Sequence, residues 1–179
     1  MLDRSPFSKV LVEPCPTSID EDYCCHAYTL QVHKDPEILR YHQEIFVDLK
    51  VGNEIRSWSG FPFLYKKGLI LKVDSENDIQ EGDLILYFDH KNYLTHSGRM
   101  KNGRVISKWG GRAKHPFTGE TLLGDHLWMH QWEDIPGMYR SERPRARFYR
   151  MRESLASEEV RDALLEFKAN LWEKINAQR

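Results

Sequence analysis

Three consecutive strand signals lie in residues 83–109, which read DLILYFDHKNYLTHSGRMKNGRVISKW. The unbroken apolar run at the start, residues 83–88, is typical of a central strand that is buried on both faces. The Asn102-Gly103 pair is the turn signal of a two-residue β-hairpin, so it joins a strand over residues 95–100 to one over residues 104–109. An antiparallel sheet is therefore the expected centre of the fold.

Helices are expected ahead of these strands. Residues 1–20 contain three prolines and form an extended lead-in, after which a helix begins near Cys24-Cys25 and covers residues 26–33. The Asp35-Pro36 pair ends this helix, because the residue before a proline is disfavoured in the helical conformation. The proline then opens a second helix, which runs to Gly52-Asn53.

The remaining segments complete an α+β pattern. The glycine- and proline-rich stretch 110–144 is expected to be loop with a short helix near 121–132. We expect further short strands at residues 54–58, 69–73 and 146–151. A C-terminal amphipathic helix over residues 157–179 has an apolar stripe made of Val160, Leu164, Phe167, Leu171 and Ile175. Helices, antiparallel strands and a final helix, in that order, predict the α+β class.

Length and composition indicate one domain over residues 1–179. The chain is 40% hydrophobic and 30% charged, which is typical of a folded domain with its own core. The formal net charge of -1 provides no overall field that would attract nucleic acid or an anionic membrane. No apolar run approaches the roughly 20 residues of a membrane-spanning helix, and residues 1–20 lack the apolar stretch of a signal peptide. We therefore expect a cytoplasmic protein without a membrane partner.

The sharpest chemical feature is a cysteine at an expected helix start, Cys25, followed by a histidine at an expected strand start, His96. A helix N-terminus stabilises a thiolate, and an imidazole within reach can hold its proton and deliver it to a leaving amine. Composition alone favours the simpler interpretation of an inert buried cysteine, because three cysteines and eight histidines form many chance pairs.

Four segments resemble the papain-like cysteine amidases of the NlpC and CHAP types and related uncharacterised bacterial families. Their sequences are YCCHAY at 23–28, EGDLILY at 81–87, THSGR at 95–99 and NGRVISKWG at 102–110. They look like the nucleophile segment, the glycine-aspartate strand, the histidine strand and the strand of the third polar residue. The resemblance implies a papain-like core over residues 21–152, in which N-terminal helices pack on a small antiparallel sheet. It also implies a thiol hydrolase that acts on an amide, peptide or isopeptide bond.

The same resemblance assigns the nucleophile and the base. Cys25 takes the nucleophile position and His96 the position of the base. Cys24 stands where relatives often have asparagine, so the choice between the two cysteines stays open. The implied substrate is a peptide or a peptidoglycan-like molecule.

Other residues complete the implied site. Ser107 takes the third position of the triad, where relatives usually have histidine, asparagine, glutamine or an acid. His130, and after it His126, are the alternatives for this orienting role. The backbone amide of the nucleophile would stabilise the oxyanion together with Tyr23 or His26.

A metal site is not expected. His126 and His130 lie four residues apart, which on a helix would place both rings on one face. The glutamate of the His-Glu-x-x-His pattern is missing, because Leu127 stands in its place. We therefore predict no metal and no cofactor.

Two alternatives to the enzyme remain. One is a catalytically inactive papain-like binding module that recognises a peptide or a glycan. The aromatic residues of segment 58–65 could rim a substrate groove, but core packing around a hairpin is their more common role, and they are not assigned. The other is single-stranded nucleic-acid binding through the arginine- and aromatic-rich segment 139–152. Neighbouring acids can neutralise those arginines, so a solvated face is favoured and a nucleic-acid partner is not expected.

Overall fold

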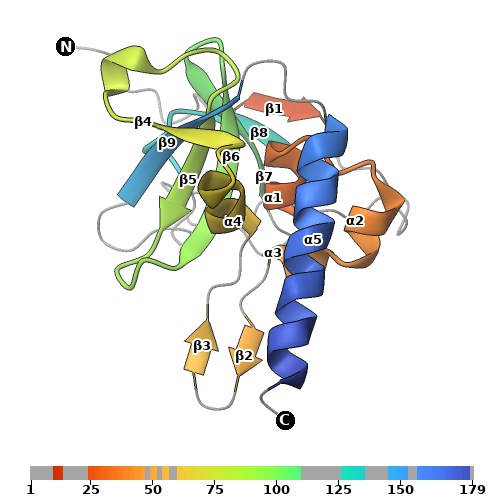
Figure 1. Ribbon diagram of the computed structural model, residues 1–179. Coiled ribbons are helices and arrows are strands. Elements are labelled where there is room, and N and C mark those ends of the chain that lie inside the picture. The colour runs from red at the N-terminus through yellow and green to blue at the C-terminus, as the bar shows by residue number, and fades with distance from the viewer. Residues whose placement is uncertain are drawn as a thin grey trace, which may run out of the picture.

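Seven strands form one antiparallel sheet in the computed structural model of this chain (Figure 1). The structure describes residues 10–13, 24–46, 49–51, 54–56, 60–109, 126–135, 145–152 and 157–177. In spatial order the strands are β1 (Val10–Glu13), β8 (His126–His130), β7 (Arg104–Trp109), β6 (Leu94–Lys101), β5 (Leu84–Phe88), β9 (Arg145–Met151) and β4 (Ile70–Val73). A separate hairpin joins β2 (Leu49–Val51) to β3 (Glu54–Arg56).

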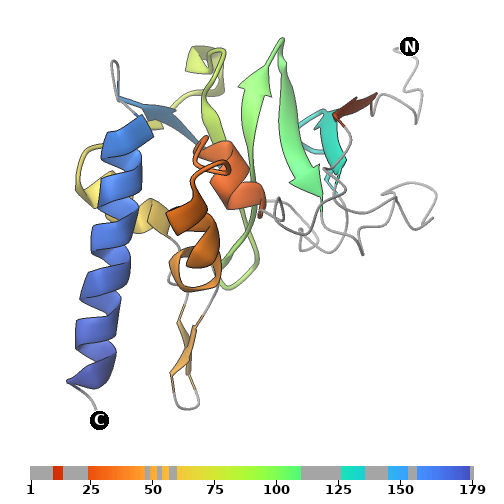
Figure 2. The same cartoon turned by 90° about the vertical axis from the view of Figure 1, so that its right-hand side faces the viewer.

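The helices pack against one face of this sheet (Figure 2). They are α1 (Cys25–Thr29), α2 (Pro36–Arg40), α3 (His42–Phe46), α4 (Gly60–Lys66) and α5 (Ser157–Asn176). A short 3-10 helix, η2 (Glu76–Asp78), lies in the connection between β4 and β5. A mixed fold with an antiparallel sheet and a C-terminal helix confirms the expected α+β arrangement. No helix among the described residues combines the length and the apolar character needed to cross a membrane.

The centre of the sheet confirms the strands predicted from residues 83–109. β5 lies between β6 and β9, and its first four residues are buried. The β6–β7 hairpin turns at Asn102 and Gly103, whose φ angles are 51° and 69°. Positive φ at both positions is what a type I′ hairpin turn requires, and asparagine and glycine adopt it at low cost.

Successive side chains of β5 point to opposite faces of the sheet and join two separate hydrophobic cores. Leu84 and Leu86 face the helices and join the larger core with Ile38, Ile45, Phe61, Val160 and Leu164. Ile85 and Tyr87 face the other way and form a smaller cluster with Val105, Ile135 and Phe148. Because residues directly opposite each other on paired strands share a face, this alternation also tells which face the paired residues of β6 and β9 occupy.

The N-terminal helices are shorter than expected. α1 begins at Cys25 as predicted, but it ends at Thr29, and the turn that follows has Gln31 in the left-handed region at φ 59°. Pro36 opens α2 as predicted, with Asp35 as its cap: the Asp35 Oδ1 accepts hydrogen bonds from the amides of residues 37 and 38. The prediction of one helix to residue 52 is wrong, since α2 and α3 are followed by β2.

Non-local packing decides two elements that the sequence pattern does not indicate. The sequence predicts no helix between the strands at 54–58 and 69–73, but Gly60–Lys66 forms α4, which packs against α5. A Cβ at Gly60 would collide with the Cδ2 of Leu164, so a larger residue here would force the Leu164 side chain to move. The short helix expected near 121–132 is instead the strand β8, which pairs with β7 on one side and with β1 on the other.

The C-terminal helix is confirmed. Val160, Leu164, Phe167 and Leu171 are buried along one side of α5, at helical spacing. Arg161 on the same helix binds Asp35 at 2.8 Å, which ties α5 to the start of α2.

Candidate functional site

The thiol of Cys25 lies beside the imidazole of His26, its neighbour on α1. The Cys25 Sγ is 3.7 Å from the His26 Nδ1, and this nitrogen is 2.8 Å from the hydroxyl of Ser97 on β6. The Ser97 hydroxyl donates to Thr29 at 2.9 Å, and Thr29 donates to the carbonyl of Cys25 at 2.8 Å. Since the Ser97 proton is used in this way, the His26 Nδ1–H donates to Ser97 and the second ring nitrogen is the unprotonated one.

Burial keeps this thiol and this imidazole neutral. The pKa of Cys25 is raised to about 12, mainly by burial and then by the neighbouring Cys24, although hydrogen bonds from Ser97 oppose the shift. The pKa of His26 is lowered to about 4 by burial. The pKa of Cys24 is also raised by burial. Neither described cysteine therefore has the depressed pKa of an activated nucleophile.

The side chain of His96 projects from β6 on the face of the sheet opposite the helices. It pairs with Tyr87 across β5 and β6, and the two rings stack with their centroids 5.8 Å apart. The next residue, Ser97, pairs with Leu86 and faces α1. The structure thus places Cys25 with His26 and Ser97 on the helix side, and His96 with Tyr87 on the opposite side. This differs from the expected Cys25–His96 pair, because adjacent residues of a strand point to opposite faces.

The predicted third residues lie on the same face as His96. Ser107 donates a hydrogen bond to the His130 Nε2 at 2.8 Å, and the Trp109 indole donates to Ser107 at 2.9 Å. The His130 Nδ1 donates to the carbonyl of Gln131 at 2.6 Å. Burial lowers the pKa of His96 well below its ordinary range, and the nearby His130 and His26 add to this effect. Ser107 and His130 therefore belong to a buried polar network on the face opposite Cys25.

The structure describes only part of the remaining predicted site residues, Tyr23 and His126. Tyr23 lies outside the described residues, as does the side chain of His126. His126 and His130 lie on a strand, β8, and not on a helix. Residues four apart on a strand are separated by roughly 13 Å, so the two residues are not neighbours as they would be on a helix. Within the described ranges, no group of three or more histidine, cysteine, aspartate or glutamate side chains is arranged to hold a metal ion.

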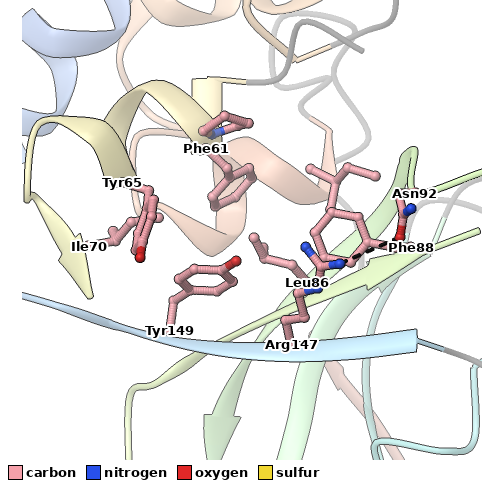
Figure 3. Close-up of a pocket in the computed structure, with 10 residues that line it drawn as sticks. Phe61, Tyr65, Ile70, Leu86, Phe88, Asn92, Arg147 and Tyr149 are labelled. Atoms are coloured by element: carbon pink, nitrogen blue, oxygen red, sulfur yellow. Dashed lines mark hydrogen bonds between the residues drawn. The ribbon is translucent and has the colours of Figure 1, made fainter. Parts of the chain in front are cut away.

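A cavity of about 380 Å³ opens on the helix side of the sheet, between α4 and strands β5 and β9. Figure 3 shows Phe61 and Tyr65 on α4 facing Tyr149 and Arg147 on β9. Its lining is mostly apolar, and the described residues that line it are Phe61, Pro62, Tyr65, Ile70, Leu86, Phe88, Asn92, Leu94, Arg147 and Tyr149. Concave, largely apolar cavities of this size with a few polar groups are the usual form of a small-ligand or side-chain site.

Sequence reasoning found only part of this cavity. Phe61 and Tyr65 belong to the aromatic segment considered as a rim, and Arg147 and Tyr149 belong to the arginine- and aromatic-rich segment. Their convergence depends on α4 lying over β9, a contact between residues about 80 positions apart that no local pattern records. Phe61 also links the cavity to α1, since its ring meets the His26 ring edge-on at 5.6 Å.

Comparisons with protein-family models, with curated proteins and with solved structures find no match to this chain. A function must therefore be argued from the chemistry of the site itself.

Proposed function

We propose that this protein is a binding module that recognises a peptide in the cavity between α4 and the sheet. The observation that carries the proposal is the cavity itself, with about 380 Å³ of space, an apolar floor and polar groups at its rim. Ile70, Leu86 and Phe61 are at most 2% exposed and form the floor. Arg147 and Asn92 are exposed at the rim and can fix the orientation of an occupant.

The lining favours a peptide over a glycan. Sugar rings carry hydroxyl groups on every side and need many hydrogen-bonding partners, whereas the floor of this cavity is aliphatic and aromatic. An apolar side chain of a peptide would be desolvated there without losing hydrogen bonds. The main chain of the same peptide would stay at the rim, where Asn92 and Arg147 offer polar contacts.

A papain-like fold is part of the proposal. It is supported by the order of α1, the β5 strand and the β6–β7 hairpin, which is the order that the resemblance implies. The separation of Cys25 from His96 by the sheet favours the inactive binding module among the papain-like alternatives.

A filling variant tests the cavity. Peptides are selected from a random octapeptide library on the wild-type protein, and their affinity is then measured by fluorescence anisotropy. Leu94→Trp places a larger side chain at the half-buried rim, whereas Leu71→Trp changes an exposed residue outside the cavity. We expect Leu94→Trp to lose about tenfold or more in affinity and Leu71→Trp to bind like the wild type. Equal affinity of both folded variants would place the binding site elsewhere.

A thiol hydrolase is the second candidate, favoured by the contact between the Cys25 Sγ and the His26 imidazole. In this version His26 would adopt its other tautomer, with the proton on Nε2, so that the unprotonated Nδ1 accepts the thiol proton and Cys25 attacks an amide carbonyl. Alkylation by iodoacetamide across pH, with the labelled cysteine located by mass spectrometry, tests it in wild type, His26→Ala and His96→Ala. Rapid labelling of Cys25 near neutral pH that slows in one histidine variant supports the hydrolase and identifies its base. Labelling that rises only at high pH contradicts it, as the raised pKa of Cys25 predicts.

A further inference from the structure

Two arginines point to the helix side of the sheet next to the cavity. Arg145 and Arg147 are two residues apart on β9, so their side chains lie on the same face of the sheet. They pair with Phe88 and Leu86 of β5 and share the face of those residues. Both arginines are exposed. The guanidinium of Arg147 lies 4.6 Å from the centre of the Phe88 ring, so a cation is held over the apolar lining.

Neither guanidinium is neutralised by a carboxylate within the described part of the chain. The other two arginines of this segment differ: Arg150 binds the buried Asp83, and Arg152 binds Glu159. The acid of the β5–β6 loop, Asp89, accepts hydrogen bonds from two amides of its own loop, those of residues 91 and 93, both at 2.8 Å.

The contacts that Arg145 and Arg147 do make leave most of their donors available. Their guanidinium groups reach the Asn92 Oδ1 at 3.4 Å and 3.5 Å, and these distances are at the long limit of a hydrogen bond. A guanidinium has five N–H donors in a planar fork, which matches the two oxygens of a carboxylate. Asn92 thus holds the two cations side by side without neutralising either.

We propose that the cavity binds a peptide that carries a carboxylate next to an apolar side chain, with Arg147 and Arg145 binding that carboxylate. This inference rests on the proposed peptide-binding function and specifies its ligand. The apolar side chain occupies the floor formed by Phe61, Ile70 and Leu86, while the carboxylate lies at the rim with the arginines. The carboxylate is either the C-terminus of the peptide or the side chain of an acidic residue.

The same observations disfavour a polynucleotide. A nucleic-acid surface needs a row of free cations, whereas Arg150 and Arg152 are already paired with acids and the whole chain has a net charge of -1. The cavity also has a floor suited to one apolar side chain and not an open row of stacking rings.

The test uses fluorescein-labelled pentapeptides and fluorescence anisotropy. The first probe, Gly-Gly-Ser-Gly-Phe, has a free C-terminus, and the second is the same peptide as its C-terminal amide. The third, Gly-Gly-Ser-Phe-Asp amide, carries its carboxylate on a side chain. Each is measured against the wild type, Arg147→Gln, Arg145→Gln and the control Lys101→Gln, which removes one positive charge in the distant β6–β7 hairpin.

We expect the free acid or the aspartate peptide to bind the wild type about tenfold more tightly than the neutral amide, since a hydrogen-bonded ion pair contributes about that much. Whichever binds identifies the source of the carboxylate. Arg147→Gln should abolish the preference and Arg145→Gln should reduce it, while Lys101→Gln should leave it unchanged.

Two results would overturn the inference, and they differ in what they imply for peptide binding. If the neutral amide binds the wild type as well as the two acids, the carboxylate preference is refuted but peptide binding in the cavity stands. If no probe binds and the octapeptide library also yields no ligand, both proposals fail. Equal loss of preference in Lys101→Gln would show a general charge effect and would also refute the assignment to Arg147.

Discussion

The buried imidazole of His26 should make the protein sensitive to acid. His26 is 7% exposed, and its pKa falls from an ordinary 6.5 to about 4 because of burial. The unfolded chain therefore takes up a proton at His26 below pH 6.5, and the folded protein resists doing so until about pH 4. The contribution of His26 to the free energy of unfolding is therefore fully present above pH 6.5 and is lost as the pH falls toward 4.

The size of the loss follows from the two pKa values. A difference of one in pKa corresponds to about 1.4 kcal/mol, so the full effect of His26 is about 3 kcal/mol. Between about pH 7 and about pH 4.5, roughly 2 kcal/mol of this is lost. Urea unfolding at the two pH values measures it for the wild type and for His26→Asn, whose amide can replace the hydrogen bond to Ser97 but does not titrate.

The difference between the two proteins isolates His26. His96 is also buried and contributes acid sensitivity, but it is present in both proteins and its pKa shift comes mainly from burial, so most of its contribution cancels in the comparison. We expect the wild type to lose roughly 2 kcal/mol more than His26→Asn between the two pH values. The variant of an exposed histidine, His90→Asn, should follow the wild type. Identical pH dependence in wild type and His26→Asn would refute the claim that His26 is buried in its neutral form.

Four further variants test the packing of the sheet. Asp83→Ala removes a buried carboxylate that makes two 2.8 Å hydrogen bonds to Arg150, so urea unfolding should show a loss of about 2–3 kcal/mol. Asp74→Ala, at an exposed ion pair with Lys72, should cost much less than Asp83→Ala because water screens the pair, and equal losses would contradict the distinction. Gly98→Ala places a methyl group 2.5 Å from the Val105 Cγ1 and 2.8 Å from the Ile106 carbonyl oxygen, so it should cost about 1–3 kcal/mol. An unchanged thermal transition would show that β6 and β7 are further apart than described. Ser107→Ala removes the hydroxyl that hydrogen-bonds Trp109 and His130 and should cost about 1–3 kcal/mol in the same assay, whereas a neutral substitution would exclude a stabilising role for this network.

Local sequence signals predicted the parts of the fold that depend on local chemistry. Asn102-Gly103 turns the β6–β7 hairpin because both residues tolerate positive φ, and Pro36 opens α2 because its fixed φ suits a first helical turn. α4 and β8 were missed because their states are decided by distant partners. α4 lies on α5, and β8 lies between β1 and β7.

In the candidate site, too, local sequence predicted the secondary structure but not the contacts between distant residues. Sequence predicted that Cys25 begins a helix and that His96 lies on a strand, and both statements are confirmed. Which of two adjacent residues on β6 faces that helix depends on the strand register, and a shift of one residue exchanges the two faces. The structure assigns the helix side to Ser97. The cavity has no local signature at all, because α4, β4, β5, β6 and β9 each supply part of its lining.

Methyl NMR during peptide titration tests peptide binding in the cavity most directly. The methyl groups of Ile70, Leu86 and Leu94 line the cavity, whereas those of Ala27 and Thr29 lie on α1 near Cys25. On addition of the selected octapeptides, we predict shifts of the three cavity residues with little change in the methyl groups of α1. Shifts confined to Ala27 and Thr29, or no shift in the cavity at saturating peptide, would contradict the account.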